Sequence, residues 1–178
     1  MSTVRQKLIL QFENDLPNLL AQYGYENNYT NFVKGEIAGS KVKDYPCLWY
    51  QAGGEDITRV GEGTNNQLCE LKFGIGVHIQ TFKEQGLLID ESEKVVNDIK
   101  RFVHNDVSIT GYGTADHKVL QWNKVQSESQ FGSCGIKKWG IEKVYPILDT
   151  AGGKAEIVFG INVVYYDFHN NINNYSTI

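Results

Sequence analysis

The sequence predicts an α+β fold, in which a mainly antiparallel β-sheet packs against two α-helices and carries long loops. Apolar residues recur with the period of an α-helix in residues 4–16 and again in residues 87–106. Apolar and polar residues alternate, as they do in half-buried strands, in residues 67–83 and 155–168. The resulting order of helix, strands, helix and strands is typical of an α+β domain.

The length of 178 residues suits a single domain. We expect the α+β domain to span residues 1–168 and the asparagine-rich residues 169–178 to form a polar tail. No apolar run approaches the roughly 20 residues of a membrane-spanning helix. The N-terminal segment lacks the small-residue cleavage site of a signal peptide. We therefore expect neither a signal peptide nor a membrane segment.

The first element is an amphipathic helix. Val4, Leu8, Phe12 and Leu16 recur every four residues, which places them on one side of a helix. Pro17 follows directly, and proline disfavours helical backbone in the residue before it. We therefore expect the first helix to end near residue 16.

A tyrosine-rich connection follows over residues 22–45, and its lack of a clear period leaves room for only one short strand. Pro46 then precedes the apolar run CLWYQ, which predicts a strand. Residues 52–66 are rich in glycine, acidic residues and asparagine. This composition predicts a projecting hairpin or loop.

The segment LKFGIGVHIQTF in the long strand 67–83 raises a question about its glycines. Its apolar residues from Leu71 to Ile79 occupy alternate positions, whereas Gly74 and Gly76 occupy the opposite face. Glycine weakens a strand, so these two positions require a reason. Two explanations stay open: the glycines let another backbone or helix approach closely, or they mark points where the strand bends or bulges.

The second helix has the clearest helical signal in the chain. Asp90 and Glu93 have the spacing of a capping box, which predicts that the helix begins at Asp90. Lys100 and Arg101 lie near its expected C-terminal end, where positive charge complements the helix dipole. Its apolar stripe predicts that it covers one face of the sheet; the stripe consists of Val95, Val96, Ile99, Phe102 and Val103.

The C-terminal part of the chain reads as strands. Residues 119–131 alternate only partly, and residues 141–148 contain Pro146, which favours a sheet edge because proline cannot donate a ladder hydrogen bond. The closing strand over 155–168 has apolar residues on one face and Gly160 on the other. These segments complete the predicted sheet.

Charge and motifs argue against several classes of function. The net charge of −4 gives no support for a dedicated nucleic-acid-binding protein. The four histidines lack metal-site spacing, and no phosphate-binding or hydrolase motif occurs. Cys134 lies near two lysines but has no evident base, while Cys47 and Cys69 are expected to be buried thiols. We therefore expect no enzyme activity, no cofactor and no metal.

Three segments that we expect to be long connections are candidates for contact with a partner, because long loops in a compact domain are often functional. The alternative is that they only decorate the surface. The segments are 22–45, 52–66 and 126–140. Their candidate contact residues are Glu55, Asp56, Arg59, Phe131, Lys137, Lys138 and Trp139.

In order and pattern, the chain resembles the tail terminator proteins of long-tailed bacteriophages. The resemblance begins with the amphipathic opening helix and the strand PCLWYQAGGED. It continues through the long alternating strand LCELKFGIGVHIQTF and the helix ESEKVVNDIKRFVHND. It closes with the strand IVFGINVVYYDF, and it covers most of the chain without a diagnostic motif.

This resemblance implies a structural virion protein that assembles in the bacterial cytoplasm as a homo-hexameric ring at the head-proximal end of the tail tube. The ring ends tube growth and joins the head-neck connector or stopper protein; in contractile phages it also contacts the sheath. DNA passes through its lumen without specific binding. In such a ring, Gly74, Gly76 and Gly160 are candidate subunit-interface residues.

Three alternatives remain at this point. Another neck component, such as a head completion or stopper protein, belongs to the same broad class. A small-molecule enzyme requires a pocket with converging polar groups. A monomeric binding module requires neither a pocket nor assembly with copies of itself.

Overall fold

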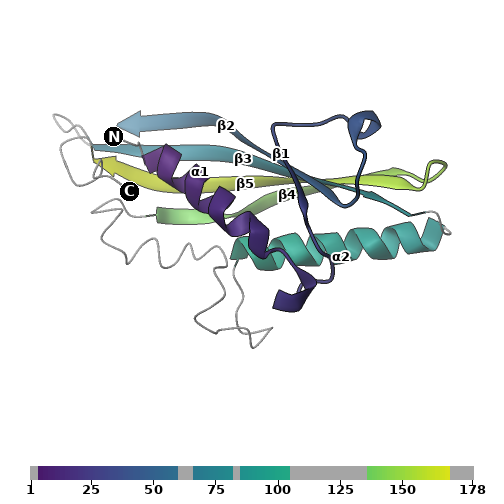
Figure 1. Ribbon diagram of the computed structural model, residues 1–178. Coiled ribbons are helices and arrows are strands. Elements are labelled where there is room, and N and C mark those ends of the chain that lie inside the picture. Colours follow the sequence, from purple (N-terminus) through teal and green to yellow (C-terminus); the bar gives the residue numbers. More distant parts are fainter. Residues whose placement is uncertain (1–3, 60–65, 82–84, 105–135, 169–178) are drawn as a thin grey trace.

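The computed structural model describes residues 4–59, 66–81, 85–104 and 136–168. These residues form one five-stranded sheet, with strand order β1-β2-β3-β5-β4, and two α-helices (Figure 1). All neighbouring strands are antiparallel except β1 and β2. The elements are α1 (Val4–Asp15), β1 (Asn31–Lys34), β2 (Cys47–Arg59), β3 (Asn66–Gln80), α2 (Gln85–His104), β4 (Ile136–Asp149) and β5 (Lys154–Phe168). The predicted α+β class is confirmed.

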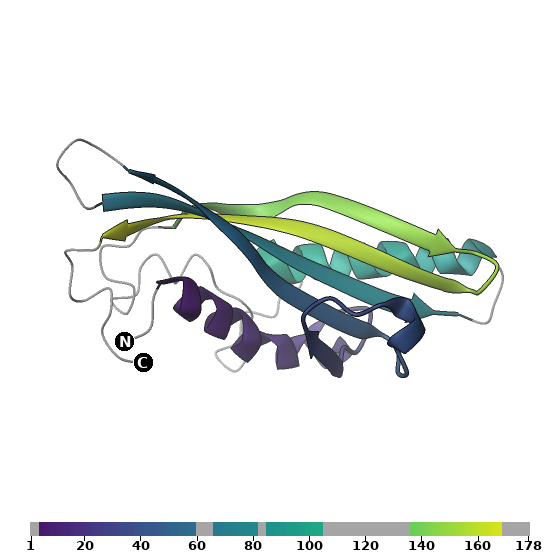
Figure 2. The same ribbon diagram turned by 90° about the horizontal axis from the view of Figure 1, so that it is seen from above.

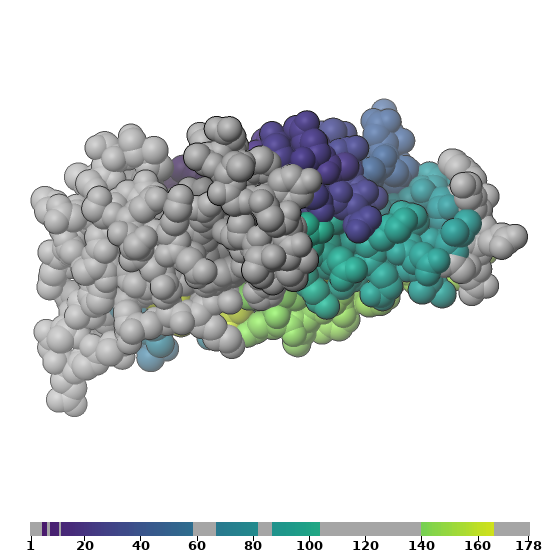
Figure 3. All heavy atoms as spheres, turned by 90° about the horizontal axis from the view of Figure 1, so that it is seen from below, coloured from purple at the N-terminus to yellow at the C-terminus, as the bar shows by residue number. Residues whose placement is uncertain are grey.

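Both helices pack on the same face of the sheet, and their side chains meet there. The Phe12 ring of α1 lies 4.6 Å from the Phe73 ring of β3 and 5.7 Å from the Phe102 ring of α2, measured between ring centroids. Seen from above, α1 and α2 run beside long, twisted strands (Figure 2). Seen from below, α2 lies between the segment that follows α1 and the β4 edge (Figure 3).

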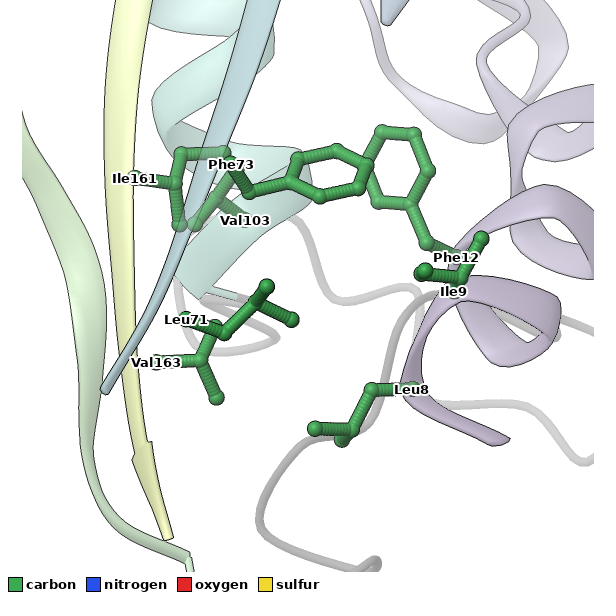
Figure 4. Close-up of a pocket in the computed structure, with 8 residues that line it drawn as sticks. All are labelled: Leu8, Ile9, Phe12, Leu71, Phe73, Val103, Ile161 and Val163. Atoms are coloured by element: carbon green, nitrogen blue, oxygen red, sulfur yellow. The ribbon is translucent and has the colours of Figure 1, made fainter. Parts of the chain in front are cut away.

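The core lies between these helices and the sheet. The alternation predicted for β3 and β5 is confirmed, because Ile75, Val77, Ile157 and Phe159 are fully buried. Figure 4 shows apolar side chains of α1, α2, β3 and β5 around a cavity of about 10 Å³, which is the size of a single water-sized probe. This space is part of the packed core and is too small for a ligand.

In the N-terminal half, the first helix and the connection that follows it agree with the sequence predictions. The first helix ends at Asp15, and Pro17 lies in a short 3-10 turn (Leu16–Asn18) directly after it. The one short strand expected in residues 22–45 is β1, which pairs with the start of β2. Cys47 and Cys69 are buried free thiols, as expected.

The predicted start of the second helix was wrong. The helix α2 begins at Gln85, so Asp90 lies within the helix and does not cap it. The reason is Leu88, which is buried and continues the apolar stripe of Val95 and Ile99 by two further turns. Packing of this leucine outweighs the capping pattern of the later acidic residues.

The loop predictions for two of the candidate contact segments, 52–66 and 126–140, were wrong in part. Residues 52–59 belong to β2, and residues 136–140 belong to β4. The expected hairpin is present, because β2 and β3 are antiparallel neighbours. A register shift between Ala52 and Glu55 hides the alternation of β2, and the glycines in the bulge resemble a loop in sequence.

The glycines of β3 are not bulge points. All 15 residues of β3 pair with β5 in an unbroken register. The irregularities lie in β2, between Ala52 and Glu55, and in β4, between Ile136 and Lys138 and between Ile141 and Lys143. The edge position predicted for the Pro146 segment is confirmed, because β4 is the last strand of the sheet.

Several predictions fall outside the described residues. These are the strand 119–131, the polar tail 169–178, Cys134 and Phe131. No helix in the described ranges is both long enough and apolar enough to cross a membrane.

Candidate functional site

The face of the sheet opposite the helices carries the candidate interface residues, and we call it the free face. It is built by the residues of β2, β3, β4 and β5 that alternate with the core positions. Its members are Trp49, Lys72, Gly74, Gly76, His78, Lys143, Tyr145, Glu156, Gly160 and Asn162. The three glycines predicted to lie at a subunit interface therefore share one face.

Trp49 explains one of these glycines within a single chain. The residue lies opposite Gly76 in the β2–β3 register, and its indole ring lies across the Gly76 backbone. A Cβ atom at Gly76 would lie 2.1 Å from Cε2 and Nε1 of the indole. No side chain fits in that space, so Gly76 is required because Trp49 packs flat on the sheet.

A polar network holds the indole in place. The Trp49 Nε1–H group donates to Glu156 Oε1 of β5 over 2.9 Å. The same carboxylate oxygen lies 3.5 Å from His78 Nε2, and that nitrogen lies 2.8 Å from the carbonyl oxygen of Ile37. The network joins β2, β3, β5 and the segment after β1. His78 is therefore a structural residue of this cluster rather than an isolated metal ligand.

Replacing Glu156 tests this network. We expect Glu156→Ala to lower the free energy of unfolding by about 1 kcal/mol, because the largely buried indole N–H group loses its acceptor. Glu156→Gln keeps an acceptor oxygen and should cost less. Urea unfolding followed by tryptophan fluorescence measures both. Equal losses for the two variants would show that the hydrogen bond to Trp49 contributes nothing.

The other two glycines form the floor of an open groove. Gly74 and Gly160 lie directly opposite each other in the β3–β5 register. A Cβ atom at Gly160 would come no closer than 3.8 Å, to Lys143 Cβ, so added bulk meets little there. The groove has a volume of about 450 Å³, and Lys72, Glu142 and Lys143 line it. A surface of this kind admits a shallow contact with another polypeptide.

A charged cluster lies beside this groove. Asn162 donates through Nδ2 to Glu70 Oε1 over 2.7 Å and to Glu142 Oε1 over 3.0 Å. The hydrogen bond from Lys72, followed by the one from Asn162, lowers the pKa of Glu70. Both glutamates therefore have donors within the chain. Across the described ranges, no group of three or more histidine, cysteine or acidic side chains is placed to hold a metal.

The described residues give no support for a catalytic constellation. The hydroxyl group of Ser92 donates to the carbonyl oxygen of Leu88 in its own helix. His78 contacts a carbonyl oxygen and a carboxylate rather than a nucleophile. The absence of enzyme activity stays a prediction, and the site candidates that remain are surfaces.

The candidate contact residues lie at the two edges of the sheet. Glu55, Asp56 and Arg59 lie in β2, beyond the part that β1 covers. Lys137, Lys138 and Trp139 lie in β4, at the opposite edge. The strands β3 and β5 lie between β2 and β4, so the two groups do not meet within one chain. Their role in partner contact stays a prediction.

Sequence reasoning missed the exposed apolar side chains of these edges. Ile57 in β2 is 55 % exposed, and Tyr145 and Ile147 in β4 are 52 % and 57 % exposed. The strand signal of β4 and its proline indicated an edge, but Tyr145 and Ile147 are exposed because they lie on the free face of that strand, in register with Val158 and Glu156. Apolar side chains at an open edge are typical of contact surfaces.

The chain matches no protein-family model and no curated protein sequence.

Proposed function

We propose that this chain is a bacteriophage tail terminator, a structural protein that forms a ring on the head-proximal end of the tail tube and ends its growth. One observation supports the proposal above all. The segments on which the resemblance rests are elements of one fold in the expected order: α1, β2, β3, α2 and β5. Together they form one sheet with both helices on one face.

The surfaces left over by the fold also suit a ring subunit. A ring requires each copy to offer two different contact surfaces to its neighbours. The sheet has two edges with exposed apolar side chains, Ile57 on one side and Tyr145 and Ile147 on the other. An enzyme would instead require a pocket with converging polar groups.

The charge of the chain is compatible with the passage of DNA. Each copy carries a net charge of −4, and a ring multiplies this charge. A negative field weakens nonspecific adhesion of nucleic acid, because phosphates are repelled rather than bound. In this proposal the partners are the tail tube protein and the head-neck connector.

Tube elongation tests the proposed function. Tail tubes of the phage that encodes the chain are extended with tube protein in the presence and absence of the purified chain. We expect growth to stop when about one ring is bound per tube, and electron microscopy should show the chain at one tube end only. Unchanged elongation together with unlabelled ends would contradict the proposal. Binding to filled heads instead would identify a head completion or stopper protein.

A further inference from the structure

We propose that copies of this chain join edge to edge, so that the outer segment of β2, residues 54–59, pairs antiparallel with the first half of β4, residues 136–143, of the next copy. The inference rests on the ring in the proposed function and names the surfaces that form it. Each joint would continue one sheet from copy to copy around the ring.

The two segments are free in the described part of the chain. The strand β1 pairs with β2 only from Cys47 to Tyr50, and the pairing ends there. No described strand pairs with the outer side of β4. Unpaired strand edges present rows of backbone donors and acceptors, which makes them templates for pairing with another chain.

The strand registers place the two free edges at the same position along the strand direction, which we call the same height. Asp56 pairs with Glu70 of β3, Glu70 pairs with Val164 of β5, and Val164 pairs with Lys138 of β4. Asp56 and Lys138 therefore lie on one line across the strands, at opposite edges. In the same way, successive pairs lead from the next residue of β2, Ile57, to Ile136 of β4.

Strand direction then allows the ring to close. The strands β2 and β3 are antiparallel, as are β3 and β5, and β5 and β4, so β2 and β4 run in opposite directions. A rotation about an axis along the strands preserves both height and direction. The β2 edge of one copy therefore meets the β4 edge of the next as an antiparallel pair at equal height. A contact without translation gives a ring when its rotation closes, rather than a helical filament.

The two edges also have complementary charge. The β2 segment contains Glu55 and Asp56 against one Arg59, and Asp56 is exposed. The β4 segment contains Lys137, Lys138 and Lys143 against one Glu142. Opposite charges on directly paired strands stabilise the pairing, whereas like charges destabilise it. The β2 edge of one copy therefore pairs more favourably with the β4 edge of a second copy than with the β2 edge of a second copy.

The structure also limits how far the pairing extends. Pro146 in β4 has no backbone N–H group to donate, which disfavours pairing in the second half of the strand. Two register shifts lie in the first half, between Ile136 and Lys138 and between Ile141 and Lys143, so the regular stretch there runs from Lys138 to Ile141. On β2, the side chain of Arg5 donates to the carbonyl oxygen of Gly53 over 2.9 Å, which marks the inner end of the available segment.

Reciprocal charge reversal tests the joint. We expect Asp56→Lys and Lys138→Glu each to raise the concentration for half-assembly by about tenfold or more, because each places like charges opposite each other. The double variant restores opposite charges and should return to within about threefold of the natural chain. Native mass spectrometry over a concentration series gives the assembled fraction of each.

The matched controls are Glu93→Lys and Lys100→Glu, which make the same charge changes at exposed positions of α2. Both should assemble as the natural chain does. A ring that is insensitive to both edge substitutions would overturn the edge pairing and leave the terminator proposal intact. A natural chain that is monomeric at every concentration would also overturn the pairing, and the tube-elongation experiment would still decide the function separately.

Discussion

Gly76→Ala should lower the free energy of unfolding by roughly 3 kcal/mol, an unusually large effect for one methyl group. The added Cβ atom would lie 2.1 Å from the Trp49 indole, so the ring must leave the sheet. Its displacement exposes a side chain that is only 5 % exposed and breaks the hydrogen bond to Glu156. Urea unfolding measures the loss, and circular dichroism establishes that the variant is folded before the titration.

Two matched variants isolate the cause. Gly160→Ala lies on the same face, with its nearest contact at 3.8 Å, and should change stability by no more than about 0.5 kcal/mol. In a Trp49→Ala background, Gly76→Ala should cost almost nothing, because the atoms that the new methyl group meets are gone. A cost of roughly 3 kcal/mol in that background as well would show that the backbone, not the indole, requires glycine.

Asp98→Ala is the second substitution with a large expected effect, a loss of at least about 3 kcal/mol in the free energy of unfolding. Asp98 is fully buried in α2 and accepts hydrogen bonds from two backbone N–H groups, of Glu26 and Asn27, over 2.7 and 3.0 Å. It also accepts from the Asn27 side chain and the Tyr29 hydroxyl group. Alanine would leave these donors without an acceptor and release the segment before β1 from α2.

Asp98→Asn is the control for Asp98→Ala, because it keeps one acceptor oxygen and nearly the same volume. It should cost about half as much, roughly 1–2 kcal/mol at neutral pH. Chemical denaturation of the three proteins under identical conditions gives the comparison. An alanine variant as stable as the asparagine variant would mean that the donors of residues 26–29 find water or other acceptors.

Stability should depend on pH through the same carboxyl group. Burial raises the pKa of Asp98 above its usual value, and the hydrogen bonds from Glu26, Asn27 and Tyr29 only partly oppose this. Asp98 therefore favours the folded state most below its unfolded pKa, and this contribution is lost as the pH rises through the folded pKa. The cost of Asp98→Asn should thus be larger near pH 3.5 than at pH 7. A cost that increases with pH would contradict the raised pKa.

Much of the fold could be predicted because alternation and helical period are local signals. The alternation from Leu71 to Ile79 gave the long β3 strand, and the one proline in residues 141–148 gave the edge position of β4. The start of α2 could not be predicted in the same way. Whether Leu88 extends the helix depends on what it packs against, and the local capping signal at Asp90 suggested a later start.

The candidate surface was harder to predict, because it depends on pairings between distant segments. The sequence showed that Gly76 needs a reason, but only the β2–β3 register reveals that this reason is Trp49. Likewise, Asp56 and Lys138 were both singled out in expected loops. Their equal height at opposite edges follows from three successive strand registers, none of which is encoded locally.

The position of β5 has a consequence for the order of folding. This strand lies between β3 and β4, and its pairing with β3 joins residues about 70 to 100 positions apart in the chain. The β2–β3 and β4–β5 pairs are local hairpins, whereas the ladder between them must wait until β5 has been synthesised. Until then, β3 has an unpaired side with five alternating apolar residues from Leu71 to Ile79. A nascent chain that stalls before β5 should therefore be prone to aggregation and depend on chaperones.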